Sequence, residues 1–311
     1  MISSVFGKTK PISYIIVLSF LFLFYLSVYF FLFPENISQD SVFLQVLFLA
    51  VLLLSIFVIN FIVSRNKLTG TNTYTILIYS LFIVLFPEVI SDGKAILCNF
   101  FILLATRRLV SIKSLMDVKN KIFDATLWIG MASLLYDWAL LYMLLVLITI
   151  WLYQPRKVKN WLVPLAGIFS LAIIGFGILT FIGDADFFKN RYVFSVHNNI
   201  GIVRDWKDNL LLIIYILGTV ITIFFAFLKL GKRGLGRIVS LRLILMSFII
   251  GIVVMVLEEF PEPLIILTFV PAAVFVTNYI ESIKRPNIKE VLLISSVVIP
   301  FGLLIIRFLI K

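Results

Sequence analysis

Long apolar stretches recur along the whole chain, from Ile12 to Ile310, and charged residues interrupt them only at intervals. The 311 residues are 62% hydrophobic and 14% charged, and their mean hydropathy is +1.13. A globular domain in water is roughly 25% charged, so this chain has too few polar side chains to cover a water-exposed surface. The sequence therefore predicts an all-α, polytopic integral membrane protein.

A membrane-spanning helix needs about 20 apolar residues, and fewer where it packs obliquely or stops short of the surface. On this basis hydropathy predicts about 11 transmembrane helices, at 12–33, 42–63, 73–87, 93–106, 122–136, 138–153, 161–182, 209–228, 243–257, 264–280 and 291–310. A re-entrant hairpin at 73–106 would lower that count by two. The longest outer loop, 183–208, is too short to hold a core of its own, so we expect residues 1–311 to form a single transmembrane domain.

The distribution of charge orients these segments. Lys8 and Lys10 precede a first apolar run that is too long for a signal peptide and ends in Phe33-Pro34-Glu35, which predicts an uncleaved span with a cytoplasmic N-terminus. If the spans alternate from there, most Lys and Arg residues lie in inner loops and most acids lie outside. This agrees with the accumulation of Lys and Arg in cytoplasmic loops, and it places the C-terminus outside. The net charge of +11 is therefore a signal of topology. We expect a multi-pass protein of the bacterial inner membrane and no nucleic-acid partner.

Several chemistries are excluded by what the sequence lacks. The single cysteine, Cys98, cannot form an internal disulfide, and the single histidine, His197, cannot build a His-rich metal centre. The chain has no H-E-x-x-H motif, no phosphate-binding G-x-x-x-x-G-K-[ST] loop and no G-x-S-x-G nucleophile elbow. We therefore expect no metal site and no cofactor.

Two predicted outer loops each carry a pair of acids, Glu35 with Asp40 and Glu88 with Asp92. One interpretation is that outer loops are acidic by default, because Lys and Arg are retained inside. The other is an extracytoplasmic carboxylate site in which Glu35 or Asp40 acts as a general base and Glu88 and Asp92 bind substrate.

The 183–208 loop combines aromatic and basic side chains. Its basic residues include Arg191, His197, Arg204 and Lys207. One interpretation is an interfacial segment with its aromatic rings at the level of the lipid headgroups. The other is a binding site for an anionic headgroup or a lipid phosphate, which arginine can bind through two hydrogen bonds.

The middle of the chain has a recognisable order: R-R-L at 107–109, F-D-A-T-L-W-I-G-M-A-S-L-L-Y-D-W at 123–138 and Q-P-R-K-V-K-N-W at 154–161. This order resembles the GT-C superfamily, membrane glycosyltransferases that take sugars from polyprenyl-phosphate carriers. The resemblance implies a GT-C-like helix bundle with an active site on the outer face and a catalytic acid in the first outer loop. The whole chain also resembles an uncharacterised bacterial inner-membrane family, a domain of unknown function.

These observations leave three hypotheses open. The first is glycosyl transfer from a lipid-phosphate donor, with Glu35 or Asp40 deprotonating the acceptor and Arg191, Arg204 or Lys207 neutralising the leaving phosphate. The second is a non-catalytic membrane subunit of a cell-envelope assembly, with membrane-protein partners. The third is a transporter of lipid or lipid-linked sugar, which the scarcity of charge within the spans disfavours. The expected ligands are membrane lipid and a polyprenyl-phosphate-linked sugar.

Overall fold

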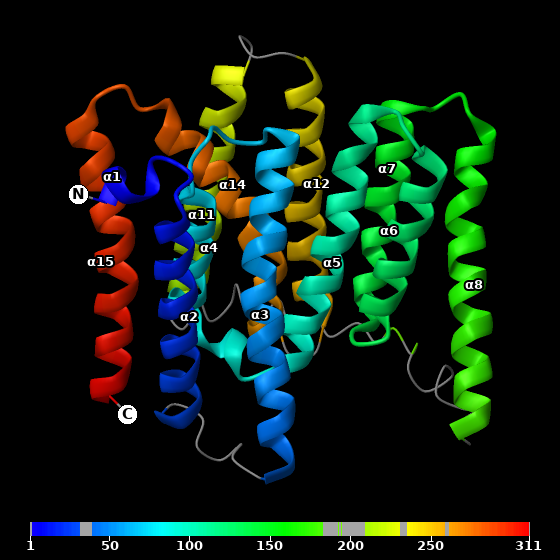
Figure 1. The fold of residues 1–311 in the computed structure, drawn as a ribbon, viewed down its shortest axis with the longest axis horizontal. Coiled ribbons are helices and arrows are strands. Elements are labelled where there is room, and N and C mark those ends of the chain that lie inside the picture. The colour runs from blue at the N-terminus through cyan, green and yellow to red at the C-terminus, as the bar shows by residue number, and fades with distance from the viewer. Residues whose placement is uncertain are drawn as a thin grey trace.

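The computed structural model describes residues 2–31, 39–182, 192, 194, 209–230, 235–258 and 261–310. Across these residues the chain is helical and contains no strand, which confirms the predicted all-α class (Figure 1). The helices are α1 (Ile2–Phe6), α2 (Pro11–Phe31), α3 (Gln39–Asn66), α4 (Tyr74–Leu85), η2 (Pro87–Ile90), α5 (Gly93–Ser111), η3 (Ile112–Ser114), α6 (Val118–Ser133), η4 (Asp137–Tyr142), α7 (Met143–Tyr153), α8 (Val158–Ile182), α11 (Leu210–Leu230), α12 (Leu235–Leu257), α13 (Pro261–Leu264), α14 (Ile266–Ser282) and α15 (Pro286–Ile310).

Each segment predicted from hydropathy coincides with a helix, and the largest difference is at the start of α12. That helix begins at Leu235 instead of residue 243, so Arg242 lies inside it with an exposed side chain. Likewise α15 begins at Pro286 instead of residue 291, and proline favours the first position of a helix. Hydropathy ends a segment at its first charged residue, whereas a helix continues through it when the long side chain can extend along its surface.

Seven of the described helices are long and apolar enough to cross a membrane. These spans are Pro11–Phe31, Val42–Asn66, Gly93–Ser114, Val158–Phe181, Leu210–Leu228, Gly236–Leu257 and Pro286–Arg307. Three further apolar helical segments are shorter, at Tyr74–Leu85, Asp137–Tyr153 and Ile266–Ser282. This composition agrees with a membrane protein.

The short helices α4 and α14 form the centre of the bundle. They pack against each other, and α4 also contacts α15 and α3 while α14 contacts α11 and α12. Nearly every side chain of α4 is buried, as is the run from Ile266 to Phe275 in α14. Between them lie the rings of Phe82, Tyr215 and Phe269, whose centroids are 5.1 to 5.9 Å apart. Long neighbouring helices therefore shield the short ones.

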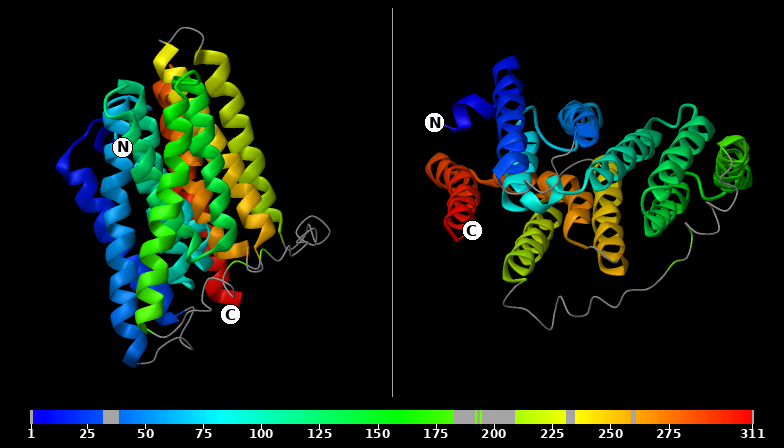
Figure 2. Two further views of the ribbon diagram at one scale, coloured as in Figure 1. Left: turned by 90° about the vertical axis from the view of Figure 1, so that its right-hand side faces the viewer. Right: turned by 90° about the horizontal axis from the view of Figure 1, so that it is seen from below.

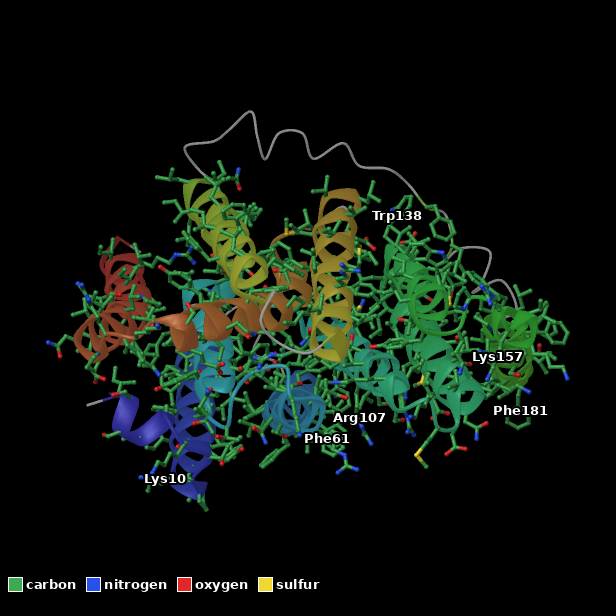
Figure 3. All side chains as sticks on the ribbon, turned by 90° about the horizontal axis from the view of Figure 1, so that it is seen from above. Lys10, Phe61, Arg107, Trp138, Lys157 and Phe181 are labelled. Carbon is green, nitrogen blue, oxygen red and sulfur yellow. The ribbon has the colours of Figure 1, made fainter. Side chains whose placement is uncertain are left out.

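The two ends of the bundle differ in charge. The connections at the top of Figure 1, which we call the basic end, carry the cations Lys67, Lys113, Arg156, Lys157, Lys284 and Arg285. The opposite end, which we call the acidic end, carries Glu88, Asp92, Asp137 and Glu258. Near the basic end Arg107 lies over the ring of Phe61, 4.8 Å from its centroid (Figure 3).

At one edge of the bundle, α8 packs mainly on α6, and α15 lies at the other edge (Figures 1 and 2). The contact with α6 is close because Gly167 and Gly130 have no side chains. A β-carbon on Gly130 would lie 2.9 Å from Leu171 Cδ1. The remaining surface of α8 is largely exposed and apolar.

Candidate functional site at the acidic end

The predicted site residues fall into two groups. Glu88 and Asp92 are described with their side chains, and Asp40 is placed by its backbone in the first turn of α3. The others lie outside the described residues, and they are Glu35, Arg191, His197, Arg204 and Lys207. The expected approach of first-loop acids to long-loop cations therefore remains a prediction.

Glu88 forms an ion pair with another side chain of the protein. It lies in η2, a short helix that Pro87 begins directly after α4. Its carboxylate accepts a hydrogen bond from the guanidinium of Arg307 in α15, and both side chains are about one-third exposed. This ion pair joins the end of the last helix to the turn after α4.

Asp92 is also engaged on both carboxylate oxygens. As the residue that caps the start of α5, it accepts the backbone N–H of Lys94 at 2.8 Å. Its second oxygen accepts the phenol of Tyr136, from the connection between α6 and η4. Tyr136 therefore joins the connection after α6 to the start of α5.

Two more carboxylates meet Trp138, at the start of η4. The backbone N–H of Trp138 lies 3.1 Å from Asp137 Oδ1 and 3.3 Å from Glu258 Oε1. The other oxygen of Asp137 accepts the backbone N–H of Phe194 at 3.1 Å. We call Asp92, Asp137 and Glu258 the carboxylate cluster, because all three contact residues 136–138 or lie within them.

The three acids of the carboxylate cluster do not converge on a single point. Among the residues that the structure describes, no three His, Cys, Asp or Glu side chains are grouped closely enough to hold a metal ion. The acids instead contact the 136–138 segment at separate points. Each oxygen of Asp137 accepts one N–H, and a carboxylate oxygen can accept more than one hydrogen bond, so Asp137 retains the capacity to bind a hydroxyl group.

An apolar cavity of about 260 Å³ adjoins the carboxylate cluster. It lies between α6 and α8 at the edge of the bundle, and its lining consists of Gly130, Ser133, Leu140, Ile168, Leu171, Ala172, Tyr192 and Phe194. The hydroxyls of Ser133 and Tyr192 are 2.9 Å apart. Phe194 joins the two features, because its ring lines the cavity and packs 5.4 Å from the ring of Trp138 while its N–H binds Asp137.

The carboxylate cluster is recessed relative to the ends of the longest helices. At 1.5 Å per residue, α3 is about 42 Å long and α8 about 37 Å, whereas α6 is about 24 Å. Figure 1 shows α3 and α8 continuing well past η2 and the start of η4 at the acidic end, and Figure 2 shows the same from the side. The carboxylate cluster therefore lies nearer the middle of the bundle than the lower ends of α3 and α8 do.

The sequence analysis places most acids outside but does not single out Asp137 or Glu258 for the site. Their meeting depends on Trp138 and Glu258 being neighbours although they are 120 residues apart in the chain. The signal available in the sequence was the Tyr136-Asp137-Trp138 triplet, which places an acid between two amphipathic aromatic residues at the end of an apolar run.

A family model for proteins of unknown function, DUF6427, matches residues 7–309, nearly the whole chain. The chain belongs to this family. The match confirms the expected relationship to an uncharacterised family, and DUF6427 carries no assigned activity. No curated protein and no solved structure matches the chain. Any function for this DUF6427 member must therefore be argued from its own residues.

Proposed function

We propose that the protein crosses the bacterial inner membrane about 11 times, with the basic end in the cytoplasm and the acidic end outside. The separation of charge between the two ends supports this orientation, because Lys and Arg accumulate in cytoplasmic loops. The short helices α4, α7 and α14 and the more polar α6 complete the crossings in this arrangement. Their burial or their position between long helices compensates for their length.

We further propose that the acidic end acts on a lipid-linked substrate, with glycosyl transfer from a lipid-phosphate donor as the reaction. The observation that carries this proposal is the position of the carboxylate cluster, recessed beside a cavity lined with apolar side chains at the edge of the bundle. A lipid-linked sugar has the matching two parts. Its hydrocarbon chain suits the cavity, and its hydroxyl groups suit carboxylate acceptors.

In this reaction the acceptor hydroxyl attacks the anomeric carbon while the bond from that carbon to the phosphate oxygen breaks. A carboxylate takes the hydroxyl proton, and the lipid phosphate leaves with the bonding electrons. A general base must reach the hydroxyl at about 2.6–3.2 Å, directly or through one water. Glu35 and Asp40 are the predicted bases, and Asp137 joins them as an acid beside the cavity. Arg191, Arg204 and Lys207 are the predicted cations for the leaving phosphate, whose charge is best met by groups fixed in advance.

Release of polyprenyl phosphate tests this function. Purified protein in lipid nanodiscs is supplied with a radiolabelled polyprenyl-phosphate hexose and a lipid extract as the source of acceptor. Asp137→Asn and Glu35→Gln remove basicity while preserving shape, so we expect both to reduce release by at least tenfold. Asp124→Asn makes the same chemical change in an acid of α6 whose ion pair with Arg108 is partly exposed, and it should leave release unchanged. Equal release by the wild type, Asp137→Asn and Glu35→Gln would refute the proposed role of these acids.

A second function, that of a non-catalytic subunit in an envelope assembly, is favoured by the contacts of Glu88 and Asp92. Both acids bind partners within the protein, Arg307 and Tyr136 respectively, so they act as connections between helices. A subunit would co-purify with other membrane proteins in a fixed ratio, and Asp137→Asn would change neither this ratio nor any lipid-phosphate release. Transport of lipid or lipid-linked sugar would instead move a labelled donor between leaflets without releasing its phosphate.

A further inference from the structure

A second cavity, of about 310 Å³, lies at the basic end, where the first turns of α6 and α8 face each other. Its lining consists of Leu115, Asp117, Val118, Lys119, Asn120, Gln154, Lys157 and Asn160. Polar and apolar side chains both contribute to it, unlike the almost wholly apolar cavity at the acidic end. We call it the basic pocket.

Hydrogen bonds fix one wall of the basic pocket. Asn160 is buried, and its Nδ2 donates to Gln154 Oε1 at 2.6 Å. Beside them the indole of Trp161 donates to the carbonyl of Pro155 at 3.1 Å. On the opposite side, Lys121 Nζ donates to the carbonyl of Ser111 at 2.9 Å and so holds the turn that precedes α6. The pocket is therefore built by contacts that do not use the side chains of its two lining lysines.

The ammonium groups of those two lysines, Lys119 and Lys157, are exposed and make no hydrogen bond or ion pair with the described residues. Asp117 is the one carboxylate in the lining. Two further cations, Arg156 and Lys159, flank Lys157 in the chain. The positive, N-terminal ends of the α6 and α8 dipoles also lie at the pocket. Together with the lysines they make the pocket strongly favour an anion over a cation.

Apolar side chains at the rim indicate where the anion comes from. Leu115 is 55% exposed, Met116 68% and Val158 71%. Such side chains are unfavourable in water but favourable at the boundary between headgroups and acyl chains, where basic residues also gain from anionic lipid. A ligand that carries both a phosphate and hydrocarbon chains satisfies the pocket and its rim together.

We propose that the basic pocket binds the phosphate headgroup of an anionic phospholipid from the leaflet at the basic end. Lys119 and Lys157 pair with the phosphate from two sides, while Asn120 provides a further hydrogen-bond donor. Leu115, Met116 and Val158 contact the upper part of the acyl chains. This site is separate from the carboxylate cluster, and it does not depend on glycosyl transfer.

Native mass spectrometry of the full-length protein, titrated with phosphatidylglycerol or phosphatidylcholine, tests the proposal. The variant Lys119→Gln/Lys157→Gln should bind phosphatidylglycerol at least tenfold more weakly than the wild type. The matched control is Lys8→Gln/Lys10→Gln, which removes two exposed lysines across the bundle from Lys157 (Figure 3). It should bind as the wild type does. Because all four lysines are exposed, thermal unfolding should be unchanged in both variants.

Three results would contradict the proposal that the basic pocket binds an anionic phospholipid. An equal loss of binding in both variants would mean that phosphatidylglycerol responds to overall charge and not to the pocket. Equal binding of phosphatidylcholine and phosphatidylglycerol to the wild type would remove the preference for an anion. Displacement of phosphatidylglycerol by an equal concentration of inorganic phosphate would assign the pocket to a soluble anion instead of a lipid.

Discussion

Gly167 of α8 packs directly against Thr126 of α6, so closely that a β-carbon on Gly167 would lie 2.7 Å from Thr126 Cγ2. A β-carbon essentially never lies that close to a non-bonded atom, and the Thr126 side chain is held by its hydrogen bond to the Ile122 carbonyl. The absence of a side chain at residue 167 therefore sets how near α8 lies to α6, and with it the width of the apolar cavity that both helices line.

Gly167→Ala should accordingly destabilise the protein by about 1–3 kcal/mol, the usual cost of overpacking. Thermal unfolding in detergent measures the change. Gly177→Ala is the matched control in the same helix, because no heavy atom lies within 4 Å of its added carbon, and its stability should be unchanged or slightly higher. Equal effects of the two substitutions would contradict the close contact of α8 with α6.

Glu281 should contribute strongly to stability at the basic end. Its Oε1 accepts the backbone N–H of Gly70 and the amide of Asn72, each at 2.7 Å, and Arg237 lies 3.9 Å from the other oxygen. The Glu281 side chain is only 12% exposed. Hydrogen bonds to a charged group contribute about 1.5–3 kcal/mol, so Glu281→Ala should lower the free energy of unfolding by about 2 kcal/mol.

Two further variants separate the causes of that loss. Glu281→Gln keeps an acceptor for Gly70 but loses the charge opposite Arg237, so its destabilisation should be intermediate. Lys284→Gln changes an exposed charge nearby and should have no measurable effect. We expect the denaturant midpoint to be lowest for Glu281→Ala, intermediate for Glu281→Gln and unchanged for Lys284→Gln. A Glu281→Ala protein as stable as the wild type would mean that this network is not formed.

The Glu88–Arg307 ion pair should be measurable as a coupling between two positions. Because both side chains are about one-third exposed, we expect a modest interaction of about 1 kcal/mol. Glu88→Gln and Arg307→Gln should each destabilise the protein, and the double variant should cost less than their sum. Strict additivity of the two single effects would show that the residues do not interact.

Topology can be tested with reporter fusions that are active on only one side of the membrane. Fusions after Lys157 and Arg285 should report a cytoplasmic location, because these positions belong to the basic end. Fusions after Asn36 and Glu262 should report the opposite side. A fusion whose side disagrees with its neighbours would identify a helix that does not cross.

Hydropathy was sufficient to locate the helices, because burial in lipid selects apolar residues over the full length of each segment. It misjudged the starts of α12 and α15, where Arg242 and Glu290 lie inside a helix. The site was less predictable. Glu88 and Arg307 are 219 residues apart, and no local pattern indicates that they meet. The same holds for Trp138 and Glu258, whose contact depends on how α12 packs beside η4.

The shortness of α4 has a consequence for how the protein is made. Its 12 residues are about 18 Å long, against a hydrocarbon layer of about 30 Å, so α4 is poorly suited to stand alone in lipid. Its central partner α14 is joined to it by a hydrogen bond of 3.1 Å between the hydroxyls of Thr75 and Thr277, which are 202 residues apart, so α14 leaves the ribosome long after α4. Until α14 is inserted, α2 and α3 or the insertion machinery must cover the surface of α4. Completion of the interior is thus a late, post-insertion step in biogenesis.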